Sequence, residues 1–136
     1  GDVSEEASRL MEATRRSLEK GIEAARAGGR LGDIGNAVQS VAEGAGYSVV
    51  REFVGHGIGR KMHEPPNVPN YGAKGTGIRL VGGMTLAIEP MVNQSSHQVR
   101  VDDDGWTVRT RDGGLSAHFE HTVAITDEGI VLLTVL

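Results

Sequence analysis

Two histidines lie close together in a segment rich in glycine and proline, residues 55–72, which reads GHGIGRKMHEPPNVPNYG. They are His56 and His63. Glycines at positions 55, 57 and 59 remove side chains around the first imidazole, so backbone or a ligand can approach it closely. Prolines at 65, 66 and 69 stiffen the exit, because each fixes its own φ and restricts the residue before it. The segment therefore predicts an imidazole presented to a metal or a substrate on a rigid loop.

Two glutamates sit in apolar runs that otherwise predict buried strands. Glu89 lies in residues 84–92, MTLAIEPMV, and Glu120 lies in residues 116–126, SAHFEHTVAIT. Ionised glutamate is rarely buried unless it is paired or bound to a metal. One imidazole and two carboxylates suit Mn²⁺, Fe²⁺, Co²⁺ or Zn²⁺. Because the chain has no cysteine, a thiolate metal site is excluded.

Simpler explanations stay open at this point. One has His56 as a turn histidine whose ring only hydrogen-bonds to backbone. The other has Glu89 paired in the core with Arg79 or Arg100. Pro90 directly follows Glu89, which favours an interrupted strand over a regular ladder and so a special role for the glutamate.

Composition limits the function classes. The 136 residues form one domain or a large piece of one. A net charge of −4 argues against a nucleic-acid-binding domain, which is usually basic. No apolar run approaches the roughly 18 residues of a membrane span, and the polar start GDVSEE does not predict a signal peptide. The absence of cysteine fits a reducing compartment, so we expect a cytoplasmic protein with no nucleic-acid or membrane partner.

The hydrophobic periodicity predicts an α+β fold, with two helices packed on one face of an antiparallel sheet. Ser4 is the expected cap of a first helix that ends near residues 28–29, and a second helix is expected over residues 32–45. The predicted strands are 47–54, 85–92, 99–102, 106–111, 117–126 and 130–135. Strand alternation places His118 on the face of Glu120, so His118 either touches the site or only packs.

Four blocks of the sequence resemble type I methionine aminopeptidase, in the order of that family and over nearly the whole chain. They are HGIGRKMHEP from His56, GMTLAIEPMVN from Gly83, DGWTV from Asp104 and SAHFEHT from Ser116. The resemblance implies the pita-bread (creatinase/aminopeptidase-like) fold, which has two similar halves around a dinuclear metal site. Residues 1–136 would form the C-terminal portion of that catalytic domain.

The resemblance also implies roles for individual residues. His56, Glu89 and Glu120 match metal ligands for two divalent ions (Co, Mn, Fe or Zn), with Glu120 bridging them. His63 matches a catalytic histidine that contacts the scissile peptide group of the substrate. Met62 and Trp106 match residues beside the bound methionine. The implied reaction is metal-dependent removal of the initiator methionine from nascent polypeptides.

The family site also needs two aspartates from its N-terminal half, and this chain offers only Asp2 as a stand-in. We therefore expect the chain to need an N-terminal half for activity, joined covalently or supplied as a separate chain. Two alternatives remain: a related proline-specific peptidase of the same fold, and a binding module of this fold without catalysis.

Overall fold

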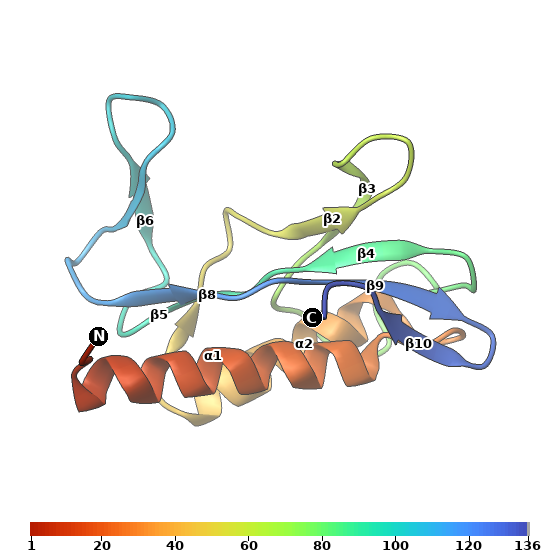
Figure 1. The fold of residues 1–136 in the computed structure, drawn as a ribbon, viewed down its shortest axis with the longest axis horizontal. Helices are drawn as coiled ribbons and strands as arrows, with labels where there is room; N and C mark the ends of the chain where they lie inside the picture. The colour runs from red at the N-terminus through yellow and green to blue at the C-terminus, as the bar shows by residue number, and fades with distance from the viewer. Residues whose placement is uncertain (136) are drawn as a thin grey trace.

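A computed structural model of the protein describes residues 1–135. Two helices, α1 (Glu5–Ala24) and α2 (Leu31–Gly44), lie side by side beneath the strands (Figure 1). Ser4 caps α1 as predicted, because its hydroxyl accepts the Ala7 N–H at 3.1 Å. The first helix ends at Ala24, before the glycines expected to stop it. Neither helix in this part of the chain is long and apolar enough to cross a membrane.

The strands form three antiparallel groups, which confirms the α+β prediction. The five-stranded sheet has the order β10-β9-β4-β2-β3, the three-stranded sheet has the order β1-β5-β8, and β6 and β7 form a separate hairpin. In Figure 1 this hairpin projects away from the rest of the molecule. The strand bounds are Ser48–Val49 (β1), Gly55–Gly57 (β2), Glu64–Val68 (β3), Thr85–Ile88 (β4), Met91–Asn93 (β5), Val99–Val101 (β6), Val108–Thr110 (β7), Ser116–His118 (β8), His121–Thr126 (β9) and Gly129–Leu132 (β10).

The segment around His56 is a strand, and the prediction of a rigid loop was wrong there. Strand β2 pairs with β3 on one side and with β4 on the other. Its glycines allow this tight fit: a Cβ at Gly55 would overlap the Ala87 carbonyl oxygen, and one at Gly57 would overlap the Pro65 carbonyl oxygen. The prolines of β3 are tolerated because β3 is the edge strand of its sheet. The predicted strand 47–54 is correspondingly reduced to two residues, β1.

Two long predicted strands, 85–92 and 117–126, are each interrupted. The first breaks at Glu89–Pro90, between β4 and β5, and the second breaks at 119–120, between β8 and β9. On one side of the two breaks Ile88 pairs with His121, and on the other side Met91 pairs with His118. The register is therefore the same on both sides, so Glu89 lies opposite Glu120.

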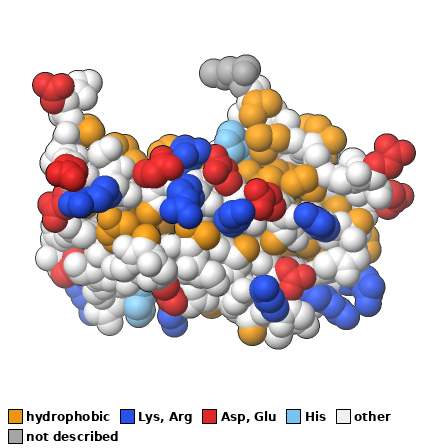
Figure 2. Space-filling view, turned by 90° about the horizontal axis from the view of Figure 1, so that it is seen from below, with side chains coloured by type: hydrophobic (Ala, Val, Ile, Leu, Met, Phe, Trp, Pro, Cys, Tyr) orange, Lys and Arg blue, Asp and Glu red, His pale blue; other side chains and the backbone are white. Residues whose placement is uncertain are grey.

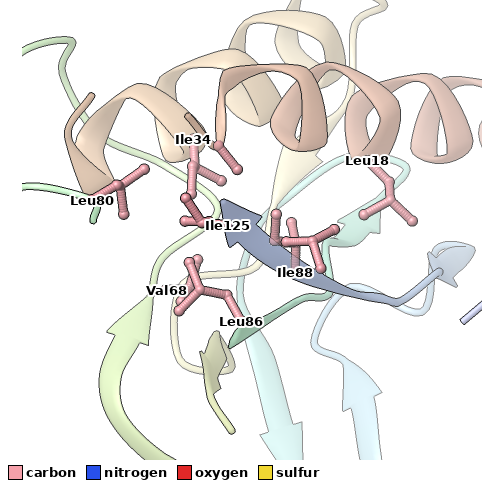
Figure 3. Close-up of a cluster of buried hydrophobic side chains, with 9 residues drawn as sticks. Leu18, Ile34, Val68, Leu80, Leu86, Ile88 and Ile125 are labelled. Carbon is pink, nitrogen blue, oxygen red and sulfur yellow. The ribbon is translucent and has the colours of Figure 1, made fainter. Parts of the chain in front are cut away.

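A cluster of buried aliphatic side chains fixes these strands from the helix side. Leu86 and Ile88 of β4 pack with Ile34 of α2 and Leu18 of α1 (Figure 3). Each such side chain contributes roughly 1.5–3 kcal/mol when it is fully buried. Gly21 permits the close approach of the helices, because a Cβ there would lie 2.7 Å from a Val38 methyl group. The strand that ends at Glu89 is thus held by its buried face.

The helix face of the molecule carries mixed charge. Figure 2 views the molecule from below and shows acidic and basic side chains interspersed, with no large area of one sign. On α1, Arg15 pairs with both Glu12 and Glu19, and Lys20 pairs with Glu23. This face offers no basic patch for a nucleic acid.

Candidate metal centre

The structure brings His56, Glu89 and Glu120 together, although they are far apart in the sequence. One ligand atom from each lies within 4.8 Å of the other two, and His56 Nε2 is 3.8 Å from Glu89 Oε2. His56 pairs with Ala87 across β2 and β4, and Ala87 is two residues before Glu89, so both side chains are on one side of the sheet. Glu120 enters from the opposite strand break. The convergence therefore follows from strand register.

A backbone hydrogen bond orients the His56 ring. Its Nδ1 lies 3.0 Å from the Gly57 carbonyl oxygen. A carbonyl can only accept, so Nδ1 carries a proton, and in the neutral ring Nε2 keeps the lone pair that a metal needs. Nε2 faces Glu89, and the imidazole is buried. A histidine held through its other nitrogen in this way is the usual form of a metal-ligating histidine.

The pKa of Glu89 is raised from its ordinary value of 4.5 to about 7. Burial is the largest cause, the negative charge of Glu120 and a hydrogen bond with that carboxyl group add to it, and His56 opposes the shift. The Glu89 side chain is only 16 % exposed. Glu120 is exposed, so the expectation that both glutamates are buried was wrong for this one. Glu120 lies where the chain passes from the three-stranded sheet to the five-stranded sheet, and its side chain is left open to solvent there.

The paired-core explanation for Glu89 also fails. Among residues 1–135, neither Arg79 nor Arg100 pairs with Glu89: its neighbour is the His56 ring, and Arg100 pairs with Asp102 on the projecting hairpin. Two carboxylates that face each other with one imidazole have no fixed positive charge to balance them. Such a set attracts a cation.

The three side chains fit a divalent first-row ion. Three atoms that are each about 2.1 Å from one ion lie on average at most about 3.6 Å apart. The observed separations, all within 4.8 Å, therefore need the side chains to move together by up to about one ångström. Nitrogen and carboxylate oxygen donors without sulfur suit Mn²⁺, Fe²⁺, Co²⁺ or Zn²⁺.

His63 and Met62 lie beside this cluster, on the loop between β2 and β3. The ring centroids of His63 and His56 are 4.0 Å apart, with an interplanar angle of 36°. The Met62 side chain is exposed. Both help to line an open cavity of about 490 Å³. The cavity is lined by His56, Ile58, Gly59, Arg60, Lys61, Met62, His63, Glu89, Glu120 and Thr122.

Other residues considered from the sequence lie elsewhere. Trp106 is 86 % exposed on the loop between β6 and β7 and does not line the cavity. His118 lines a different cavity, of about 210 Å³, together with Met91. His118 therefore does not line the cavity of the cluster, and of the two possibilities left open for it the contact with the site is not seen. Asp2 is not among the described side chains that form the cluster.

Sequence reasoning missed two threonines near the site. Thr122, the second residue of β9 after the break that carries Glu120, lines the cavity. Thr134 hydrogen-bonds to His121 and to the Thr122 backbone. A hydrogen bond between a single hydroxyl and a residue twelve positions earlier leaves no repeating pattern in the sequence, so no sequence signal pointed to Thr134.

The fold and site define a class: half of a pita-bread fold with a histidine–carboxylate metal cluster. Residues 1–127 match the family model described as metallopeptidase family M24. The chain belongs to this family. It is 57 % identical to a methionine aminopeptidase from Clostridium perfringens over 100 % of its own length and 55 % of that protein.

Solved structures support the same grouping. Methionine aminopeptidase from Rickettsia prowazekii superposes with a TM-score of 0.97, at 48 % identity, over 99 % of this chain and 55 % of that one. A prolidase from Pyrococcus furiosus, at 22 % identity, superposes with a TM-score of 0.74 over 100 % of this chain and 34 % of that one, so it shares the fold. The chain spans about half the length of the methionine aminopeptidases that it matches.

Proposed function

We propose that residues 1–136 are the C-terminal portion of a methionine aminopeptidase catalytic domain. The observation that carries the proposal is the meeting of His56, Glu89 and Glu120 at one open cavity. The substrate would be a polypeptide with an N-terminal methionine, and the reaction its removal by hydrolysis. We expect this to take place in the cytoplasm.

His56, Glu89 and Glu120 would hold divalent ions, two in the complete enzyme, with Glu120 bridging them. Bound there, such ions supply a Lewis acid that polarises a peptide carbonyl and lowers the pKa of water. The Gly57 carbonyl keeps the His56 lone pair turned towards the ligand position. Burial and the raised pKa of Glu89 leave a protonated or shared carboxyl when no cation is present. The native metal among Co, Mn, Fe and Zn belongs to the same proposal.

His63 would act on the substrate and not on the metal. Its ring is exposed beside His56 and lines the cavity. From there it can hydrogen-bond to the scissile peptide group and stabilise the charge that develops in the transition state. Met62 would give the substrate methionine an apolar contact. Trp106 would join it only if the projecting hairpin closed over the cavity.

The site is incomplete in ligands. One imidazole and two carboxylates supply few anionic oxygens for two cations, and no described aspartate joins them. An N-terminal half, covalent or as a second chain, would complete it. The half-length match to the relatives supports this division.

A proline-specific peptidase of the same fold is the second candidate. The identity of 57 % to a methionine aminopeptidase, against 22 % to a prolidase, favours the first. A non-catalytic module of this fold is a weaker candidate, because the three donor side chains are present and meet.

The test is hydrolysis of a Met-Ala peptide and an Ala-Pro peptide by the chain plus an N-terminal half, with Co²⁺ or Mn²⁺ added. That half can be taken from the Clostridium perfringens relative. We expect cleavage of the methionine peptide, its loss in Glu89→Gln, and its retention in Glu128→Gln, which alters an exposed turn residue. Cleavage of the proline peptide alone would favour the second candidate. Cleavage of neither by a folded pair would favour the non-catalytic module.

A further inference from the structure

Thr134 hydrogen-bonds to the two residues that follow Glu120, His121 and Thr122, and we call these three residues the clamp. The Thr134 hydroxyl oxygen accepts the Thr122 N–H at 3.0 Å and lies 2.8 Å from His121 Nδ1. In addition, the Leu133 N–H donates to the Thr122 carbonyl at 2.8 Å. The clamp joins the segment after β10 to the start of β9.

The Thr134 hydroxyl ties the His121 ring to the backbone of the next residue. Its oxygen accepts from the Thr122 N–H and is within hydrogen-bond distance of His121 Nδ1. A hydroxyl has one proton and two lone pairs, so it can serve both partners at once.

The clamp lies next to a part of the chain where Glu120 belongs to no strand. Glu120 lies in the break between β8 and β9, and its side chain is exposed. On one side, Phe119 packs against the core and donates its N–H to the Pro90 carbonyl at 3.4 Å. On the other side, His121 and Thr122 are the next two residues. The regular pairing of β9 with β10 ends at Leu132, so Thr134 takes the place of a strand partner there.

We propose that His121 and Thr134 are positioning residues that hold Glu120 in place to bind a cation. The inference rests on the proposed role of Glu120 as a ligand. Loss of a partner that orients a ligand typically weakens metal binding about 10- to 100-fold. Because the clamp is one residue removed from Glu120, we expect an effect at the lower end of that range.

The experiment compares Thr134→Val, which keeps the shape and loses the hydroxyl, with Thr134→Ser, which keeps the hydroxyl. The matched control is Thr126→Val at the other end of the β9–β10 pair, where the Thr126 hydroxyl donates to the Gly129 carbonyl at 2.7 Å. Co²⁺ binding to the 136-residue chain is followed by visible absorption. The ring nitrogens of His121 are followed without metal by ¹⁵N NMR.

We expect Thr134→Val to weaken Co²⁺ binding about tenfold and to shift the ¹⁵N signal of His121 Nδ1, which loses its hydroxyl partner. Thr134→Ser and Thr126→Val should bind as the wild type does. If Thr134→Val does not fold, His121→Phe and His121→Asn replace it. The asparagine amide can accept from or donate to the Thr134 hydroxyl, so this variant should bind Co²⁺ more tightly than the phenylalanine variant.

The outcomes separate this inference from the proposed function. Wild-type binding with an unchanged Kd in Thr134→Val or in His121→Phe overturns the positioning role alone. An equal loss in Thr126→Val also overturns it, because the effect would then be general destabilisation. Absence of Co²⁺ binding by the folded wild type overturns the ligand role of Glu120, and the positioning role with it.

Discussion

Replacing Glu89 with glutamine should stabilise the metal-free chain at high pH. The pKa of Glu89 is raised from 4.5 to about 7 in the folded chain, so the folded state binds this proton more tightly than the unfolded state. Stability therefore falls as pH rises from about 4.5 to about 7, and the full penalty is present above that window. Below pH 4.5 the carboxyl group is protonated in both states and contributes nothing.

The size of the effect follows from the same shift. At about 1.4 kcal/mol per pKa unit, a change from 4.5 to about 7 corresponds to an upper bound of roughly 3.5 kcal/mol. Glutamine still buries a polar amide, and the cavity is open on one side. We therefore expect a gain of about 1–2 kcal/mol at pH 8 and almost none at pH 4. The glutamine amide can also donate to Glu120, as the protonated carboxyl does.

The assay is urea unfolding followed by circular dichroism, at pH 4 and pH 8, in the presence of a chelator. Glu128→Gln is the control, because it removes the same charge from an exposed turn. Adding Mn²⁺ at pH 8 should stabilise the wild type and leave Glu89→Gln nearly unchanged. A destabilised Glu89→Gln at pH 8, or an equal change at both pH values, would refute the reasoning.

Three further predictions concern the site and its frame. His63→Ala in the completed enzyme should lower kcat by roughly 10²–10³, as for loss of one oxyanion donor, and leave the metal content unchanged; loss of metal by elemental analysis would instead make His63 a ligand. The 136-residue chain with Co²⁺ or Mn²⁺ should not cleave a Met-Ala peptide until an N-terminal half is added, and turnover by the lone chain would contradict the ligand count. Gly55→Ala should destabilise the chain by at least about 2 kcal/mol, because its Cβ would overlap the Ala87 carbonyl oxygen and force β2 from β4. Gly44→Ala, with open space around its Cβ, should be neutral or stabilising.

The sequence identified the three clustered side chains because each is a polar group in an unusual local setting. Glu89 interrupts an apolar run, and Pro90 correctly predicted the break between β4 and β5. The strand around His56 was missed because glycine and proline normally predict turns. Here the glycines serve close pairing with two neighbouring strands, which is a tertiary effect.

Alternation along a strand could not decide between contact and packing for His118, for a related reason. Counting residues by two assumes one continuous strand in one sheet. Between His118 and His121 the chain leaves the three-stranded sheet and joins the five-stranded one. Local pattern cannot report such a change of partner, and it cannot report the contact of Thr134 with His121.

The register of the two breaks explains why this fold can hold a cation. Directly opposite residues of an antiparallel pair project to the same face, so Glu89 and Glu120 bring like charges together. Such a pair destabilises the folded chain unless a proton or a cation lies between the two carboxylates. The raised pKa of Glu89 reflects this, because Glu120 favours the protonated form of Glu89. The aliphatic core beneath β4 holds Glu89 in place despite the repulsion, since Leu86 and Ile88 are almost fully buried. A divalent cation there would satisfy both carboxylates and a neutral His56 at once, which a single proton cannot do. Binding of a cation would relieve the repulsion between the two carboxylates, and this relief would add to the affinity for metal.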